Sequence, residues 1–435
     1  MDQPSLRSVL TRPLTTHLER ICGPLAPRRL AGLRWFWREA IFVQAAESFS
    51  ADYIPLFALA AGATTTDIGF LAAAANLLSV AGFLPGAMAA ARLRTRKTMV
   101  LSTSYGPSRL MLPLLACLPF LLPSGSMLVF FIIVINALRI FGGSMGNPAW
   151  TSFVADLVPQ ERRGRFFSSR AFASGLTALV VSPLAGLLIR TVNGGKAGAL
   201  AGYQVSLFAA FTVGLFSLAF FLKIPEPPPR TPPRLRRQAR NLVALLKGNP
   251  AFTWLAASSI VWNLATNIPG PFFNVFIVTK IGGNAAVVGT NAGVFALAGL
   301  VGQLFFGRVI DQRGNRRILI TTGLGISVVP FLWSVAQVPL HVYLLNIPGG
   351  FLWAGYNVAS FNILLEMSPA EDRESAFALY QTVVAASAVI GPLLGSLLVD
   401  LVGYRPMFAA SGVGRFVGAF CFIFFTRPRK TAPAV

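Results

Sequence analysis

Long apolar runs separated by short polar clusters are the feature that most constrains this chain. A helix needs about 20 mainly apolar residues to cross the hydrocarbon core of a bilayer, and each run is close to that length. Only 12% of the 435 residues are charged and 54% are hydrophobic, whereas a soluble domain has about 25% charged residues. The chain is therefore expected to be a helical membrane protein, and a soluble fold is excluded.

The run lengths predict an all-α membrane protein with twelve transmembrane helices. These helices are expected near residues 39–61, 67–91, 98–122, 127–150, 167–188, 201–222, 254–279, 285–306, 318–336, 342–365, 377–398 and 407–425. The longest polar stretch, which contains PEPPPRTPPRLRRQAR, divides them into two sets of six. We therefore expect an N-terminal tail over residues 1–38, a six-helix bundle over 39–222, a linker over 223–250, a second six-helix bundle over 251–426 and a C-terminal tail over 427–435.

The distribution of positive charge predicts the orientation of the chain. The net charge of +22 comes from short clusters between apolar runs, not from one face of a folded domain, which excludes a nucleic-acid-binding protein. Of the 37 Lys and Arg residues, 30 lie in the N-terminal tail, the even-numbered loops and the C-terminus. Basic residues favour cytoplasmic loops. We expect a monomeric, multi-pass protein in the lipid bilayer of the cell inner (plasma) membrane, with both termini and the linker in the cytoplasm.

An internal repeat supports two pseudo-symmetric halves. Five residues of the first half recur at a constant spacing in the second half: Asn147, Ala149, Asp156, Pro159 and Arg163 recur as Asn357, Ala359, Glu366, Pro369 and Arg373. Halves that each contain an even number of helices keep the same orientation in the membrane.

The loop between the eighth and ninth expected helices resembles a known signature. Its sequence GRVIDQRGNRR places Gly307, Asp311, Gly314, Arg316 and Arg317 in the GxxxDxxGxRR pattern of the major facilitator superfamily (MFS), and DLVPQERRGR is similar to another loop of that family. The resemblance implies a cytoplasmic latch in which Asp311 pairs with arginines. The expected gating residues also include the repeat pairs Asp156 and Arg163, and Glu366 and Arg373. Alternatively, the two glycines allow a tight turn and a close helix contact.

Two further segments are similar to motifs of the drug/proton antiporter branch of the MFS. They are Arg139-Ile140-Phe141-Gly142-Gly143 in the fourth helix and Ser182-Pro183-Leu184-Ala185-Gly186 in the fifth, which has a counterpart in Gly391-Pro392-Leu393-Leu394-Gly395 of the eleventh. Small residues beside proline also allow close packing and bending of helices, which is the alternative interpretation.

Glu47 and Asp52 are the only acids expected well inside a membrane span, and such groups are costly in lipid. If the first helix starts near Glu39, Glu47 lies roughly 12 Å along it, at a depth similar to that of Arg139. We predict proton coupling by Glu47, Asp52 and Arg139, with Glu47 facing the cavity beside Arg139 and Asp52 near Arg109. A permanent ion pair between the first and fourth helices is the alternative. Arg109 and Arg415 are expected to snorkel to the interface or to pair structurally.

Polar residues on the helices that line the MFS cavity are expected to bind substrate. Neutral amides and aromatic rings hydrogen-bond to and stack on organic molecules, although amides also join helices to one another. Pro269 and Pro271 are expected to kink or break the seventh helix. The candidate substrate-binding residues are Gln44, Asn136, Asn263, Asn267, Asn274, Asn346, Trp353, Tyr356 and Asn357.

The sequence contains neither a phosphate-binding loop of the GxxxxGK[ST] type nor a nucleophile and base set, so we expect no enzyme activity, no cofactor and no bound metal. The predicted function is secondary active transport by alternating access, as proton-coupled efflux of an amphiphilic organic compound. Proton-coupled or facilitative uptake of a small metabolite is one alternative, and a non-transporting accessory protein of the same fold is another. Sodium is an alternative coupling ion.

Overall fold

The computed structural model describes residues 14, 16–23, 25–92, 95–196, 198–226, 250–368 and 373–425. The start of the expected N-terminal tail, most of the expected linker and the expected C-terminal tail lie outside these ranges. The side chain of Arg373 and the repeat residue Pro369 lie outside the description as well.

Twelve helical passages follow one another in the described chain, as the run lengths predict. The first six are α2 (Pro27–Ser50) with α3 (Ile54–Ala60), α4 (Thr65–Arg92), α5 (Arg96–Val100) with η1 (Leu101–Tyr105) and α6 (Pro107–Leu121), α7 (Ser126–Leu157), α8 (Arg163–Val192) and α9 (Ala201–Leu222). The last six are α11 (Pro250–Asn267) with α12 (Phe272–Thr279), α13 (Ala285–Arg313), α14 (Asn315–Ser334), α15 (Pro339–Met367), α16 (Arg373–Val402) and α17 (Tyr404–Phe425).

Eight helices in the described ranges are long and apolar enough to cross a membrane. The other four passages are α15 and the three that are broken into shorter pieces. Broken helices in membrane proteins occur where the backbone is buried in protein or lines a cavity, because its freed polar groups need partners. The passages with interrupted helices are therefore the ones in which a polar site forms most readily.

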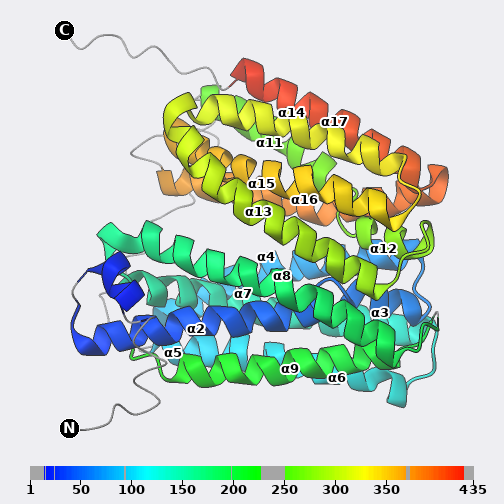
Figure 1. Ribbon diagram of the computed structural model, residues 1–435, viewed down its shortest axis with the longest axis horizontal. Coiled ribbons are helices and arrows are strands. Elements are labelled where there is room, and N and C mark those ends of the chain that lie inside the picture. Colours follow the sequence, from blue (N-terminus) through cyan, green and yellow to red (C-terminus); the bar gives the residue numbers. More distant parts are fainter. Residues whose placement is uncertain are drawn as a thin grey trace. The chain divides into compact units, whose positions relative to one another are not determined.

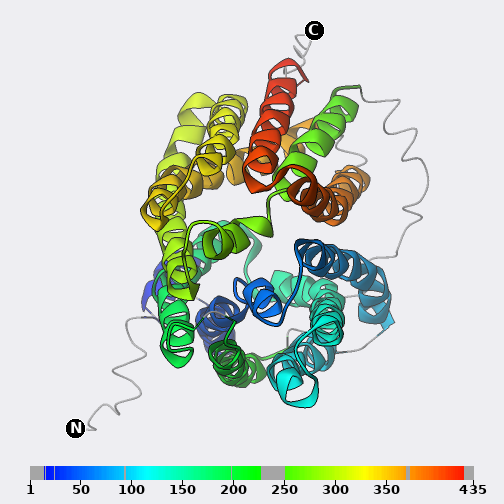
Figure 2. The same cartoon turned by 90° about the vertical axis from the view of Figure 1, so that its right-hand side faces the viewer.

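The chain divides into two compact units, residues 1–61 with 78–232 and residues 62–77 with 233–435. In the first unit α2 packs against α8 and α9, and α6 packs against α7 and α9. In the second unit α15 packs against α13 and α14, and α17 packs against α11 and α14. The helices of each unit run side by side (Figure 1) and are seen nearly end-on in Figure 2.

Proline determines where the broken passages are interrupted. The seventh passage stops at Asn267 and resumes at Phe272, with Pro269 and Pro271 between, as the sequence predicts. In the third passage Pro107 has no N–H to donate, and the preceding turn widens so that Gly106 N donates to Leu101 O at 2.8 Å. Such π-turns are frequent at functional sites.

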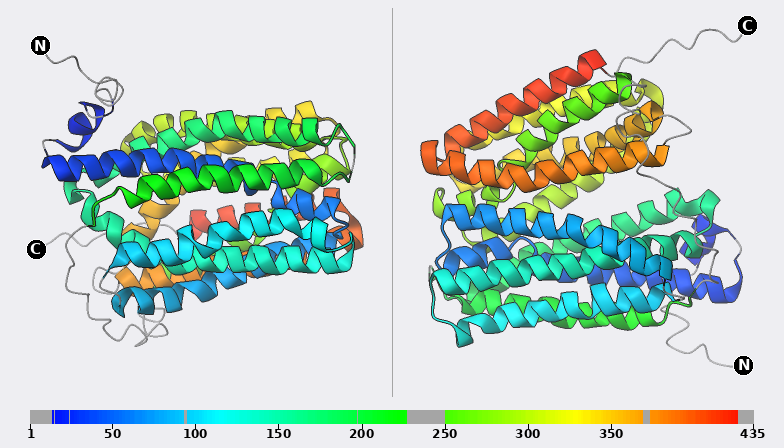
Figure 3. Two further views of the ribbon diagram at one scale, coloured as in Figure 1. Left: turned by 90° about the horizontal axis from the view of Figure 1, so that it is seen from below. Right: turned by 180° about the vertical axis from the view of Figure 1, so that it is seen from behind.

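The first passage begins earlier than expected. Its helix starts at Pro27 instead of near Glu39, so Glu39 lies in the middle of α2. Before it, residues 16–22 form a short helical segment at the end of the unit where α2 begins (Figure 3). Leu18 and Cys22 of this segment are buried in the same apolar cluster as Leu157 and Phe166. This part of the expected tail is therefore packed onto the bundle.

Candidate functional site

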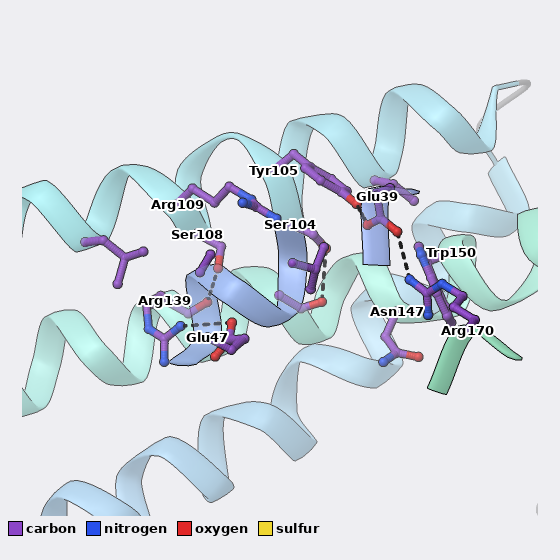
Figure 4. Close-up of a pocket in the computed structure, with 15 residues that line it drawn as sticks. Glu39, Glu47, Ser104, Tyr105, Ser108, Arg109, Arg139, Asn147, Trp150 and Arg170 are labelled. Atoms are coloured by element: carbon purple, nitrogen blue, oxygen red, sulfur yellow. Dashed lines mark hydrogen bonds and ion pairs between the residues drawn. The ribbon is translucent and has the colours of Figure 1, made fainter. Parts of the chain in front are cut away.

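A cavity of about 340 Å³ lies within the first unit. It is lined by charged, polar and apolar groups that come from α2, α5, η1, α6, α7 and α8. Figure 4 shows Glu47 and Arg139 toward one end and Glu39 with Arg170 toward the other. The lining residues are Glu39, Val43, Ala46, Glu47, Val100, Ser104, Tyr105, Ser108, Arg109, Leu112, Arg139, Gly143, Asn147, Trp150 and Arg170.

Glu47 and Arg139, which the sequence suggested as partners, are brought together. Glu47 Oε1 lies 3.9 Å from Arg139 Nη1, and the Glu47 side chain is 50% exposed while that of Arg139 is 10% exposed. Arg139 Nε also donates to Asn136 Oδ1 at 3.3 Å, which makes Asn136 a support for the arginine. The contact between the two charges is long and one side of it is open, so other groups have access to the carboxylate.

Glu39 is the site residue that sequence reasoning missed. Its side chain is only 1% exposed, its Oε2 accepts from Arg170 Nη2 at 2.7 Å, and its Oε1 accepts the hydroxyl hydrogen of Tyr105. The Arg170 guanidinium lies 4.4 Å from the ring centroid of Phe36 and 5.7 Å from that of Trp150. Because both carboxylate oxygens and the cation have partners, this group forms a satisfied buried network.

Arg109 lines the same cavity. Its guanidinium lies 4.7 Å from the ring centroid of Tyr105 and interacts electrostatically with Glu39 and Glu47. Asp52, which was expected near Arg109, lies in the turn between α2 and α3 and outside the cavity lining. The prediction for Arg109 was snorkelling or structural pairing, and it did not include a position in the lining of the cavity.

Arg415 does not snorkel. The residue is 3% exposed on α17 of the second unit, and its Nε has no hydrogen-bond partner in the described part of the chain. Snorkelling is wrong here because the side chain is buried, and the alternative, structural pairing, is not found either, since Arg415 has no ion-pair partner among the described residues.

Glycines on α7 allow the third passage to approach the cavity closely. A Cβ atom at Gly142 would lie 3.3 Å from Thr103 O, and one at Gly146 would collide with the Ser104 side chain. Ser104 Oγ donates to Gly143 O at 3.1 Å, and Ser108 Oγ donates to Arg139 O at 2.7 Å. The segment from Arg139 to Gly143 therefore combines the arginine with the small residues that bring η1 and α6 beside it.

The candidate amides of the second unit mostly bond within or between helices. Asn263 Nδ2 and Asn267 Nδ2 each donate to the carbonyl four residues earlier at 2.8 Å. Asn346 donates to Asn291 of α13. Asn357 is exposed on α15, and Asn274 lies on α12. In the first unit Gln44 is partly exposed on α2 and lies outside the cavity lining.

The aromatic candidates form part of a buried cluster. Tyr356 stacks on Trp262 with ring centroids 4.7 Å apart, and Trp353 meets Tyr356 edge-on at 5.4 Å. Tyr356 is 6% exposed, whereas Trp353 is partly exposed. Of the two rings, Trp353 has more surface available for stacking on a ligand.

The loop residues expected to gate the protein occupy equivalent places in the two units. Arg96 forms an ion pair with Asp156 at the end of α7, and Asn315 Nδ2 donates to Glu366 Oε1 at 2.5 Å at the end of α15. Arg163 Nε donates to Val158 O at 3.4 Å.

The GxxxDxxGxRR loop itself is a very tight connection. Gly314 is the single residue between α13 and α14. Its φ of 79° lies in the left-handed region, which favours glycine. Gly307 faces open space, Asp311 and Arg317 are exposed, and Arg316 Nη2 donates to Ile423 O at 2.5 Å. Asp311 has no arginine partner within ion-pair distance among the described residues.

These features define a polytopic helical membrane protein with two helical units and a charged cavity in the first of them. The sequence profile of the Major Facilitator Superfamily matches residues 40–280 and 263–435. The chain belongs to this superfamily.

The sequence relatives include multidrug resistance proteins. The multidrug resistance protein MdtG of Dickeya zeae is 28% identical over 188 residues, which are 42% of this chain and 45% of the relative. The MdtG protein of Citrobacter koseri is 28% identical over 189 residues, with the same coverage of 42% and 45%. The aligned part of this chain thus spans about half the length of these relatives. The similarity to the drug/proton antiporter branch is weak but present.

Solved structures show the same fold. A bacterial homologue of the human lysosomal transporter Spinster, crystallised in an inward-facing and unoccupied conformation, has a TM-score of 0.69 at 12% identity and covers 93% of this chain and 98% of its own. The D-xylose–proton symporter has a TM-score of 0.67 at 16% identity, with coverage of 93% and 97%. At these identities the likeness establishes the fold alone.

Proposed function

We propose that this protein is a secondary active transporter of the cell inner membrane that exports an amphiphilic organic compound in exchange for protons. The observation that carries the proposal is the geometry of Glu47 and Arg139, a half-exposed carboxylate 3.9 Å from a buried guanidinium. An arginine beside a carboxylate favours its charged form, whereas loss of that partner or of water favours the neutral form. The pair is therefore suited to exchanging a proton when a substrate disturbs the contact.

The transport cycle follows from this pair. Substrate binds the form in which Glu47 is ionised and in contact with Arg139, so substrate binding drives the protonated form to give up its proton. When the substrate leaves and the carboxylate takes a proton, Arg139 stays held by Asn136 and Glu47 is free to move away from it. Alternating access then carries the protonated and the substrate-loaded forms in opposite directions. Within the first unit, Gln44 is proposed to contact the substrate and Asp52 to assist the proton exchange, and the loop residues around Asp311 are proposed to gate the cytoplasmic side.

Efflux is favoured over uptake by the multidrug resistance proteins among the sequence relatives. The topology with both termini in the cytoplasm and the monomeric state belong to the same proposal.

The proposal is tested by transport in proteoliposomes. Full-length protein is reconstituted, a pH gradient is imposed, and the movement of tetraphenylphosphonium, ethidium and anionic naphthalene derivatives is followed with and without sodium. Movement against its gradient that is driven by the pH gradient, and lost in Glu47→Gln, is the expected result. Movement that does not depend on the pH gradient and is equal in wild type and Glu47→Gln contradicts proton coupling.

A further inference from the structure

The cavity of the first unit has an uneven balance of charge. Three arginines, Arg109, Arg139 and Arg170, line it together with only two carboxylates, Glu39 and Glu47. With both acids ionised, these lining residues have more positive than negative charge. Arginine does not release its proton in proteins, so the balance cannot be restored by deprotonating one of the three.

The excess positive charge belongs to Arg109. Glu39 is occupied by Arg170 at 2.7 Å and by Tyr105, and Glu47 is 3.9 Å from Arg139. Arg109 has no carboxylate within ion-pair distance in the described part of the chain, and the contact of its guanidinium with the Tyr105 ring leaves its charge in place.

The position of this guanidinium is built into the packing of α6 against α9. A Cβ atom at Gly214 of α9 would collide with Arg109 Nη1, so the absence of a side chain there makes room for the arginine. A cation that is largely removed from water is costly unless an anion compensates it. A bound anion is one way to supply that compensation.

The chemistry of the remaining lining defines the rest of the ligand. The planar guanidinium binds carboxylate, sulfonate and phosphonate groups through paired hydrogen bonds. Val43, Ala46, Leu112 and Trp150 add apolar surface to the same cavity. A ligand with an anionic group and an apolar body therefore matches both parts.

We propose that the substrate of this cavity is an organic anion whose charged group binds Arg109 and whose apolar body packs against Leu112 and Trp150. This inference rests on the proposed function, because it names the substrate class for the same cavity. It also makes Arg109 a specificity-determining residue, separate from the pair of Glu47 and Arg139 that exchanges the proton.

The test compares two probes that share a ring and differ in the sign of their charge, 2-naphthalenesulfonate and 2-naphthyltrimethylammonium. Binding of each to the full chain in detergent is measured by calorimetry. The wild type is expected to bind the sulfonate at least about tenfold more tightly, because a charge-assisted bidentate contact is worth at least about one factor of ten. Arg109→Gln should lose this preference, Arg109→Lys should keep part of it, and Arg415→Gln, a matched change of a buried arginine in the second unit, should keep all of it.

Two results overturn the inference. The first is equal binding of both probes by the wild type, which requires no variant to fold. The second is sulfonate binding that survives unchanged in Arg109→Gln. Gly214→Ala serves as a second variant, since it displaces the guanidinium and keeps its charge, and it is expected to weaken sulfonate binding more than ammonium binding.

Proton changes recorded on the same samples separate this inference from the proposed function. Sulfonate binding that depends on Arg109 but causes no proton release or uptake supports the anion site and contradicts proton exchange at Glu47. Proton release on sulfonate binding that is the same in wild type and Arg109→Gln supports the exchange and contradicts the anion site.

Discussion

The guanidinium of Arg170 holds the carboxylate of Glu39 at 2.7 Å, between α8 and α2 and deep inside the first unit. The same cavity contains a second carboxylate, Glu47, whose arginine is 3.9 Å away and whose side chain is 50% exposed. Two acids on one helix thus have opposite surroundings, one enclosed and fully bonded, the other open and weakly paired. This contrast gives Glu39 a structural part and makes Glu47 the acid to which we assign the proposed proton exchange.

Replacement of Glu39 should destabilise the protein more than replacement of Glu47. Breaking a buried ion pair leaves an uncompensated charge and costs about 3–5 kcal/mol. The contact of Glu47 is long and its carboxylate is half-exposed, so it is closer to a surface pair, which contributes at most about 1 kcal/mol. Unfolding of Glu39→Gln and Glu47→Gln is followed by titration with denaturing detergent. A double variant, Glu39→Gln with Arg170→Gln, should recover part of the loss. Equal stability of the two single variants contradicts this assignment.

The ion pair of Arg96 and Asp156 is expected to support the end of the first unit at which α7 ends. Asp156→Asn removes the charge partner of a partly buried arginine, so it should lower both the unfolding free energy, by about 1–3 kcal/mol, and the transport rate. The charge swap Arg96→Asp with Asp156→Arg should restore part of both. Asp311→Asn is the control for stability, since Asp311 is exposed. A charge-swapped protein whose unfolding free energy and transport rate are no higher than those of Asp156→Asn would show that the ion pair does not support either quantity.

Gly395 should tolerate no side chain. A Cβ atom there would collide with Ile268 O, next to the break between α11 and α12. Gly395→Ala is therefore expected to cost about 1–3 kcal/mol by overpacking, whereas Gly307→Ala, which faces open space, should be neutral or stabilising by up to about 1 kcal/mol. Thermal unfolding of both variants checks the difference. Similar effects in the two would mean that α16 does not pack closely on the break.

Cys22 should react slowly with maleimide. Burial raises the pKa of its thiol, and Arg162 opposes this only in part. Since the thiolate is the reactive form, the labelling rate of a variant with Cys117→Ser and Cys421→Ser should keep rising with pH beyond the ordinary thiol pKa of 9.0. Leu18→Glu should speed labelling at pH 7 by releasing residues 16–22 from the bundle. Fast labelling of the parent protein at pH 7 contradicts the docked arrangement.

The number of helices and the pairing of Glu47 with Arg139 could be predicted from the sequence, because apolar run length predicts the spans and the rise per residue places the two groups at a similar depth. The role of Glu39 could not, since α2 continues back to Pro27 through a polar stretch that lacks apolar run length. Pro27 at the first turn was the available signal, as proline favours the start of a helix. The contacts of Arg170 and Tyr105 depend on how helices pack, which a single sequence does not encode in its spacing.

The most direct test of proton exchange is the proton change when substrate binds to purified protein in weakly buffered detergent. Wild type and Glu47→Gln are compared with the two naphthalene probes and tetraphenylphosphonium, and a pH indicator reports the change. Proton release by the wild type that is absent in Glu47→Gln is the predicted result. Substrate binding without any proton change in either protein would contradict proton exchange at Glu47.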